Sequence, residues 1–436
     1  MPKKIKKPPK PKDRSKVLLW IVDKIILIVI AIAAGYAVYY FTTHKEDVRK
    51  QEALVATIEN AEKIQVNDPK AALEIYKDTL KSLSPQSDPQ LFARVKQNEG
   101  DCLSDLSLVN NREDNLKNAI IAYEAALEIR TFNKYPNEYA SIHNNLGIAY
   151  RNLSEVREKE KNVKYAIKEY EEALTIYTID KFPIDYAQTQ NNLGNAYGNL
   201  SEVRDKETNV TLAIKAYEEA IKIRTIDKFP IDYAQTQNNL GNAYGNLSQK
   251  RNKETNIKLA VKAYEEALKI YTIDKFPTQY AGIQNNLGVA YWELSEVRDK
   301  ETNVNLAIKA YEEALKIRTI DKFPIDYAQT QNNLGNAYRN LSLARDKETN
   351  VKLAVKAYEE ALKIKTIDKF PNDYAQTQNN LGAAYKELSQ VRDKETNVKL
   401  AVKAYEEALK IYTQKDYPDS YELVMKNLNK AREMLR

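Results

Sequence analysis

Apolar residues recur at helical spacing in the segment that begins at Pro183. In its first half they stand three, four or seven positions apart, at Tyr186, Leu193, Ala196, Tyr197, Leu200 and Val203. Such spacing places side chains on one face of an α-helix. The second half continues the pattern at Leu212, Ala213, Ile214, Ala216, Tyr217, Ala220 and Ile223. The segment therefore predicts two amphipathic helices and no strand.

Proline and capping residues predict where the two helices begin and end. Pro183 and Asp185 favour the start of the first helix, since proline suits the first turn and aspartate the positive helix end. Thr208 and Asn209 are competent N-caps, so we expect the second helix to begin near them. Residues 226–230 then end it, because the residue before a proline leaves helical space.

This two-helix pattern returns along the chain with a step of 47 residues. Prolines mark the step at Pro89, Pro136, Pro183, Pro230, Pro277, Pro324, Pro371 and Pro418. A fixed period of this length indicates units that bury their apolar faces only by stacking on their neighbours. The chain is therefore expected to be a repeat array whose function lies on a long surface.

Small residues predict how the helices of one unit meet. Gly194 costs about 1 kcal/mol relative to alanine inside a helix, so its repetition needs a packing reason. It returns at Gly147, Gly241, Gly288, Gly335 and Gly382. We expect the two helix axes to approach closely there, with Tyr197 and Tyr217 filling the space around the glycine.

One long apolar run stands near the amino terminus, over residues 17–41. Its length predicts a transmembrane helix. The expected spanning residues are Trp20, Ile25, Ile28, Ile32, Tyr36 and Tyr39, with aromatic residues at both ends as membrane interfaces favour. In an alternative interpretation Ala31 to Ala33 is a signal-peptidase site, although the charged pair Asp23 and Lys24 argues against it.

A basic tail precedes this run. Residues 1–16 carry a net charge of +7, which leaves about −1 of the chain's total of +6 for the rest. The positive-inside rule then predicts a cytoplasmic amino terminus and repeats outside the cell membrane. A near-neutral array has no sustained basic stripe for phosphates, which argues against nucleic-acid binding by the repeats. The single cysteine, Cys102, excludes an intramolecular disulfide framework and a cysteine-rich metal site.

The segment NNLGNAY at 191–197, followed by Ala213, Tyr217 and Ala220, resembles the tetratricopeptide repeat. The motif returns as NNLGIAY at 144–150, NNLGNAY at 238–244 and 332–338, NNLGVAY at 285–291 and NNLGAAY at 379–385. The family's usual unit has 34 residues, so this chain is similar to long variants such as those of kinesin light chains and prokaryotic scaffolding proteins. The resemblance implies an all-α, right-handed superhelical solenoid of antiparallel helix pairs, preceded here by one transmembrane helix.

The expected organisation has five parts. They are a basic disordered tail over 1–16, a transmembrane helix over 17–43, a degenerate first helical repeat over 44–88, seven 47-residue repeats over 89–417 and a capping helix over 418–436. Both ends depart from the repeat consensus, as the caps of a solenoid do.

The resemblance also implies a binding surface, because the first helix of each unit lines the concave groove in this family. The asparagines matched to that surface are Asn98, Asn145, Asn192, Asn239, Asn286, Asn333 and Asn380, together with Asn195, Asn242 and Asn336. An asparagine can bond both the N–H and the C=O of an extended peptide. In the alternative interpretation, these side chains bond the adjacent helix.

Other candidate residues have simpler interpretations. Trp292 replaces Gly198 and Gly245 of neighbouring units, and is either a binding hot spot or packed on the next helix. His143 stands where other units carry glutamine, and the paired glutamates of AYEEA are expected on a solvated face. No nucleotide loop, zinc spacing or nucleophile motif is present. We therefore expect no catalytic site, cofactor, metal or small-molecule substrate.

These observations predict a single-pass membrane protein, in a prokaryote, that acts as a scaffold or holdase. Its partners would be proteins or extended peptides in the groove, together with the lipid bilayer. One alternative is a structural spacer or self-associating array that binds no foreign ligand. Another is a regulatory subunit of an enzyme on a different chain.

Overall fold

The computed structural model describes residues 14–435, so most of the predicted basic tail lies outside the described residues. Within that range the chain forms helices and no strand. It divides into two compact units, Met1–Tyr135 and Pro136–Arg436. The first unit contains α1 (Arg14–Gln65), α2 (Pro69–Leu80), α3 (Pro89–Leu106) and α4 (Arg112–Leu127).

The second unit contains six helix pairs and a last helix. They are α5 (Pro136–Leu153), α6 (Lys159–Leu174), α7 (Pro183–Ser201), α8 (Lys206–Ile221), α9 (Pro230–Ser248), α10 (Lys253–Leu268), α11 (Pro277–Ser295), α12 (Lys300–Leu315), α13 (Pro324–Leu341), α14 (Lys347–Leu362), α15 (Pro371–Leu388), α16 (Lys394–Leu409) and α17 (Pro418–Glu433). Each helix packs on the next, and the first helices of successive pairs also touch. The predicted all-α array of stacked helix pairs is confirmed.

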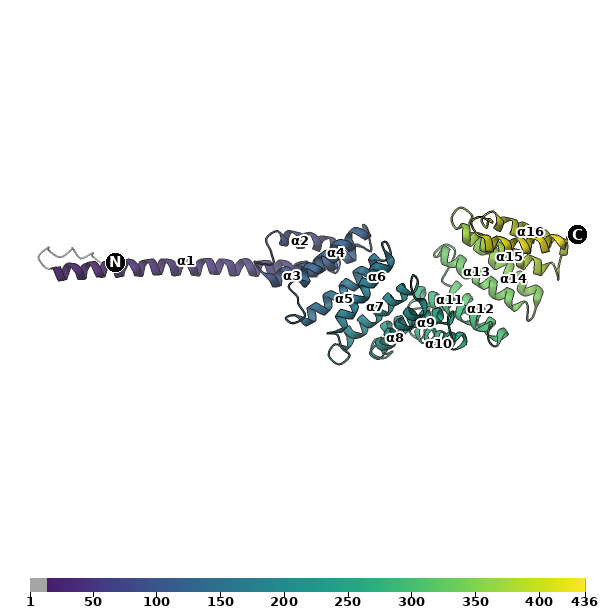
Figure 1. Cartoon of the computed structure of the whole chain (residues 1–436), viewed down its shortest axis with the longest axis horizontal. Helices are drawn as coiled ribbons and strands as arrows, with labels where there is room; N and C mark the ends of the chain where they lie inside the picture. Colours follow the sequence, from purple (N-terminus) through teal and green to yellow (C-terminus); the bar gives the residue numbers. More distant parts are fainter. Residues whose placement is uncertain (1–13, 436) are drawn as a thin grey trace. The chain divides into compact units, whose positions relative to one another are not determined.

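Helix α1 runs without a break from the apolar segment into the first unit. It has 52 residues, so the predicted boundary between residues 43 and 44 falls inside one helix. Its later part is buried at Ile58 and Ala61, whereas Ile25, Ile28, Ile32, Tyr36 and Tyr39 are all more than half exposed. Figure 1 shows the earlier part of α1 extending away from α2, α3 and α4. By length and composition, α1 is the one helix in residues 14–435 that is apolar and long enough to cross a membrane.

The first helix of each pair begins at its proline, as predicted. In α7 Phe182 is the N-cap residue and Pro183 occupies the first turn, with Asp185 beside it. The amide of Tyr186 donates to the carbonyl of Phe182 at 2.8 Å, which closes the first helical turn.

The second helix of each pair begins earlier than the sequence predicts. Helix α8 starts at Lys206, after Asp205 in the left-handed region with a φ of 39°. The prediction that Thr208 or Asn209 caps this helix is wrong. Asn209 lies inside the first turn, and its Nδ2 donates back to the carbonyl of Arg204 at 2.8 Å. The same arrangement returns at Asn162, Asn256, Asn303, Asn350 and Asn397.

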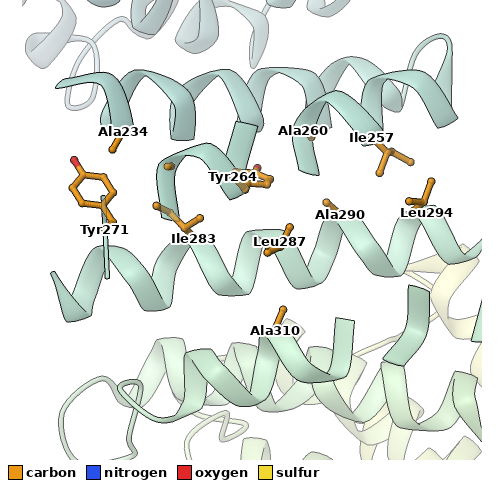
Figure 2. Packing of buried hydrophobic residues seen from close by; sticks show 11 residues of the cluster. Ala234, Ile257, Ala260, Tyr264, Tyr271, Ile283, Leu287, Ala290, Leu294 and Ala310 are labelled. Carbon is orange, nitrogen blue, oxygen red and sulfur yellow. The ribbon is translucent and has the colours of Figure 1, made fainter. Parts of the chain in front are cut away.

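The predicted close approach at the repeated glycine is confirmed. A Cβ atom added to Gly241 would lie 2.6 Å from a ring carbon of Tyr264, on the second helix of the same pair. Tyr264 is 5% exposed and belongs to a core that continues through Leu287 of α11 to Ala310 of α12. Figure 2 shows these side chains between the helices. The core is therefore continuous from one repeat to the next.

The paired glutamates are not simply solvated, because tyrosines of the first helix reach them. The hydroxyl of Tyr186 donates to Glu219 at 3.0 Å, and Lys222 donates to the same carboxylate at 2.6 Å. Four later repeats have the same triad, at Glu266, Glu313, Glu360 and Glu407. The hydrogen bond from Lys222, with a smaller one from Tyr186, lowers the pKa of Glu219 below its ordinary 4.5, although burial opposes the shift.

The lowered pKa predicts acid sensitivity. A carboxyl group with a depressed folded pKa stabilises the native state above its unfolded pKa, here 4.5, and that stability is lost as the pH falls through the folded value. We expect the unfolding free energy, measured with urea, to fall between neutral pH and about pH 3. Replacing the lysines of all five triads by glutamine should flatten this profile. An unchanged profile would assign acid sensitivity to other groups.

Candidate ligand groove

The second unit contains a groove with a volume of about 670 Å³ over α7, α9 and α11, which we call the central groove. Its rim is mostly amide side chains, at Asn195, Asn199, Gln235, Asn239, Asn242, Asn246, Gln249 and Asn286. Its floor comes from the second helices, at Val210, Ala213, Tyr217, Ile257, Ala260 and Tyr264. The central groove therefore combines an apolar floor with a polar, largely uncharged rim.

Two glycines create this space. Gly198 and Gly245 line the central groove, and a Cβ atom added to either would meet no atom within 4 Å. The other helix pairs of the second unit carry large side chains at the same register position, namely Arg151, Trp292, Arg339 and Lys386. The groove thus forms where two consecutive repeats have lost a bulky side chain.

Three predicted asparagines form bonded pairs with the preceding repeat. Asn239, Asn286 and Asn380 donate through Nδ2 to the Oδ1 atoms of Asn195, Asn242 and Asn336 at 3.1–3.3 Å. Those oxygens also accept the hydroxyls of Tyr217, Tyr264 and Tyr358 at 2.7–2.8 Å. The structure therefore shows that these residues bond the adjacent helix, as the alternative interpretation expected.

The pairs in the central groove keep hydrogen-bonding capacity for a ligand. No interaction within the described residues engages the Nδ2 group of Asn195 or Asn242, or the Oδ1 atom of Asn239. The Oδ1 atom of Asn286 accepts one hydrogen bond, from the Nδ2 group of Asn285 at 3.5 Å. Because an amide oxygen has two lone pairs, each pair still offers donors and an acceptor, the set that an extended peptide backbone needs. Bonding between helices and ligand binding are compatible here.

The remaining predicted asparagines lie elsewhere. Asn192 is 6% exposed and donates to Asn144, and Asn333 accepts from Gln329. Both lack the bonded pair because Ile148 and Val289 replace the asparagine that would receive them. Asn98, in the first unit, donates to Glu62 and so ties α3 to α1. Asn145 is half-buried on α5 beside Asn144.

Trp292 is half-buried and packs against a core formed by α12 of its own pair and α13 of the next repeat, a cluster that includes Val304 and Leu334. It does not line the central groove. The packing interpretation of this tryptophan is the one that the geometry favours.

Residues with catalytic potential are dispersed. His143 contacts Glu169, with Nδ1 2.5 Å from Oε2, and Cys102 is fully buried. Burial raises the pKa of the Cys102 thiol to about 12, which makes its reactive thiolate rare. Among residues 16–435, no three histidine, cysteine or carboxylate groups are placed to hold a metal ion.

The array of stacked helix pairs was compared with known proteins for similarity of sequence and of fold. No model of a known protein family matches the chain, and no curated protein sequence matches it either. Solved structures do. The C-terminal part of a TPR repeat-containing protein from Cytophaga hutchinsonii is 17% identical, with a TM-score of 0.44 over 74% of this chain and 99% of that chain. The apo form of RapI is 14% identical, with a TM-score of 0.49, and the match covers 87% of this chain and 98% of that chain.

MamA is a third similar structure, 21% identical with a TM-score of 0.33, covering 51% of this chain and 93% of that one. At these identities the likeness concerns the fold alone. The site must therefore be argued from this chain's own residues.

Sequence reasoning missed the central groove although its signal was present. Gly198 and Gly245 are visible as a change from large residues to glycine in consecutive repeats. What the sequence did not reveal is that these two positions face one space, bounded by Tyr217 and Tyr264 from the second helices.

Proposed function

We propose that the chain is a non-enzymatic scaffold or holdase that binds an extended polypeptide segment in the central groove. The observation that carries the proposal is the pair of bonded asparagines on its rim, Asn195 with Asn239 and Asn242 with Asn286. Each pair leaves donors and an acceptor towards the groove, and the pairs recur with the 47-residue repeat. Amides of this kind bond a peptide backbone without selecting its side chains.

The proposal includes a membrane anchor. The apolar part of α1 would cross the bilayer of a prokaryotic cell, with the basic tail in the cytoplasm and the repeats outside. Its support is the length, apolarity and exposure of this part of α1. Protease added to sealed cells should then degrade the repeats, and repeats that survive until the cells are opened would contradict this orientation.

Blocking the groove tests the binding proposal. Replacing both Gly198 and Gly245 by tryptophan should fill the groove, and α11 already carries Trp292 at this register position, so the helices tolerate it. The probe is reduced, carboxymethylated α-lactalbumin, an unfolded polypeptide, and the measurement is fluorescence anisotropy with the full-length chain in detergent. We expect at least about a tenfold loss of affinity, since several backbone hydrogen bonds are removed together.

The matched control is Lys386→Trp, which places a tryptophan at the same register position outside the central groove. It should leave the affinity for the unfolded probe unchanged. If the double tryptophan variant captures the probe as well as the unmodified chain does, the central groove is not the binding site.

A further inference from the structure

Glu293 lies on the wall of the central groove without a cationic partner. It is half-buried on α11, and no ion pair reaches its carboxylate within the described residues. The nearby Lys253 is paired with Glu296, at 2.7 Å. Burial raises the pKa of Glu293; the charge of Lys253 opposes this shift and the charge of Glu296 adds to it. The folded array therefore holds a carboxylate whose charge is poorly compensated.

The same position two repeats later has its partner. Glu387 stands at the register of Glu293, and the Nε atom of Arg339 lies 3.1 Å from its Oε1 atom. This arginine extends from α13 and also hydrogen-bonds the side chain of Tyr358. The chain thus contains, in its own repeats, one complete arginine–glutamate pair in this setting.

Gly245 occupies the register of Arg339 in the repeat before Glu293. The space that the arginine side chain fills in one place is therefore open in the other, with Tyr264 in the position of Tyr358. The carboxylate, the tyrosine and the asparagine that accepts its hydroxyl are all retained, as Glu293, Tyr264 and Asn242. Only the guanidinium is missing.

Glu293 differs from another glutamate of the groove in its charge compensation. Glu202 is paired with Lys159, whereas no ion pair within the described residues reaches Glu293. An incoming cation gains most at a partly desolvated carboxylate of this kind.

We infer that the central groove takes an arginine side chain of the bound polypeptide, placed over Gly245 with its guanidinium on Glu293. This inference rests on the proposed function and adds a sequence preference to it. A guanidinium suits the site better than an ammonium, because its planar fork of donors can reach a carboxylate and a tyrosine hydroxyl together, as Arg339 does with Glu387 and Tyr358.

The test compares two short dye-labelled alanine peptides, one with a central arginine and one with citrulline, which has the same shape and no charge. Binding to the full-length chain in detergent is measured by anisotropy. We expect the arginine peptide to bind at least about tenfold more tightly, the effect of one charge-assisted hydrogen bond. Glu293→Gln should remove this preference. Gly245→Arg should weaken the binding of both peptides, because its own guanidinium fills the space.

Asp274→Asn is the matched control, since it removes one carboxylate charge from an exposed loop of the same region and should leave the preference intact. Helicity and urea unfolding of Glu293→Gln should equal those of the unmodified chain, so loss of preference cannot come from unfolding. Equal binding of arginine and citrulline peptides would overturn the inference and leave the proposed function standing. Failure of both peptides to bind the unmodified chain would count against both.

Discussion

Replacing Gly241 by alanine is expected to destabilise the array by about 1–3 kcal/mol, the usual cost of overpacking a core. The added methyl group would lie 2.6 Å from a ring carbon of Tyr264, well inside contact distance. The ring cannot turn away freely, because it is buried and its hydroxyl donates to Asn242 at 2.7 Å. The two helices of the pair must separate instead, which also disturbs Leu287 of the next repeat.

Gly245→Ala is the control, four residues further along the same helix. No atom lies within 4 Å of its added Cβ, so the helix propensity of alanine should dominate and stabilise α9 by up to about 1 kcal/mol. Urea unfolding followed by circular dichroism compares the variants, and hydrogen exchange of the α9 and α10 amides localises the change. Destabilisation by both variants to the same extent would show that the glycine–tyrosine contact is not the cause.

Replacing Asn209 by aspartate is expected to destabilise α8 by about 1–3 kcal/mol or more, because the donor is lost and a carboxylate is placed against a carbonyl oxygen. Asn209 is 6% exposed, and its Nδ2 donates to the Arg204 carbonyl at 2.8 Å. The result distinguishes an N-cap role for Asn209 from its place inside the first turn of α8. At an N-cap, asparagine and aspartate are about equally good, so an N-cap role would make the change neutral.

Thr208→Ala is the companion variant. Thr208 is exposed inside the first turn of α8, so alanine should leave the unfolding midpoint unchanged or raise it slightly. A cost of about 1 kcal/mol would instead be typical of a lost cap. Tolerance of Asn209→Asp together with damage from Thr208→Ala would contradict the observed helix start.

The repeated motifs predicted the helix pairs and their seam because both depend on short-range patterns. The apolar stripe around Leu193 and the proline at Pro183 act within one helix. The contact of Gly194 with Tyr217 joins neighbouring helices of one pair. Such features are visible in one 47-residue unit, and the period then multiplies them along the chain.

The helix start at Lys206 could not be predicted from capping preferences. Seven residues in the same register, Asn111, Glu158, Asp205, Asn252, Asp299, Asp346 and Asp393, adopt a positive φ just before the second helix. This backbone turn lets the buried asparagine of the first turn reach back to the preceding loop. A local sequence rule favours asparagine at the cap and does not anticipate that its side chain donates to a carbonyl five residues earlier.

The amino-acid sequence by itself determined the all-helical repeat, the period, the glycine–tyrosine seam and the candidate spanning segment, since each follows from composition or from spacing within a unit. Only the tertiary structure decided what the asparagines bond, because Asn239 and its acceptor Asn195 lie 44 residues apart on different helices. It likewise decided that Gly198, Gly245 and Glu293 face one space. Those relations depend on which register positions of neighbouring repeats meet when the helices stack, and a pattern within one repeat does not contain that information.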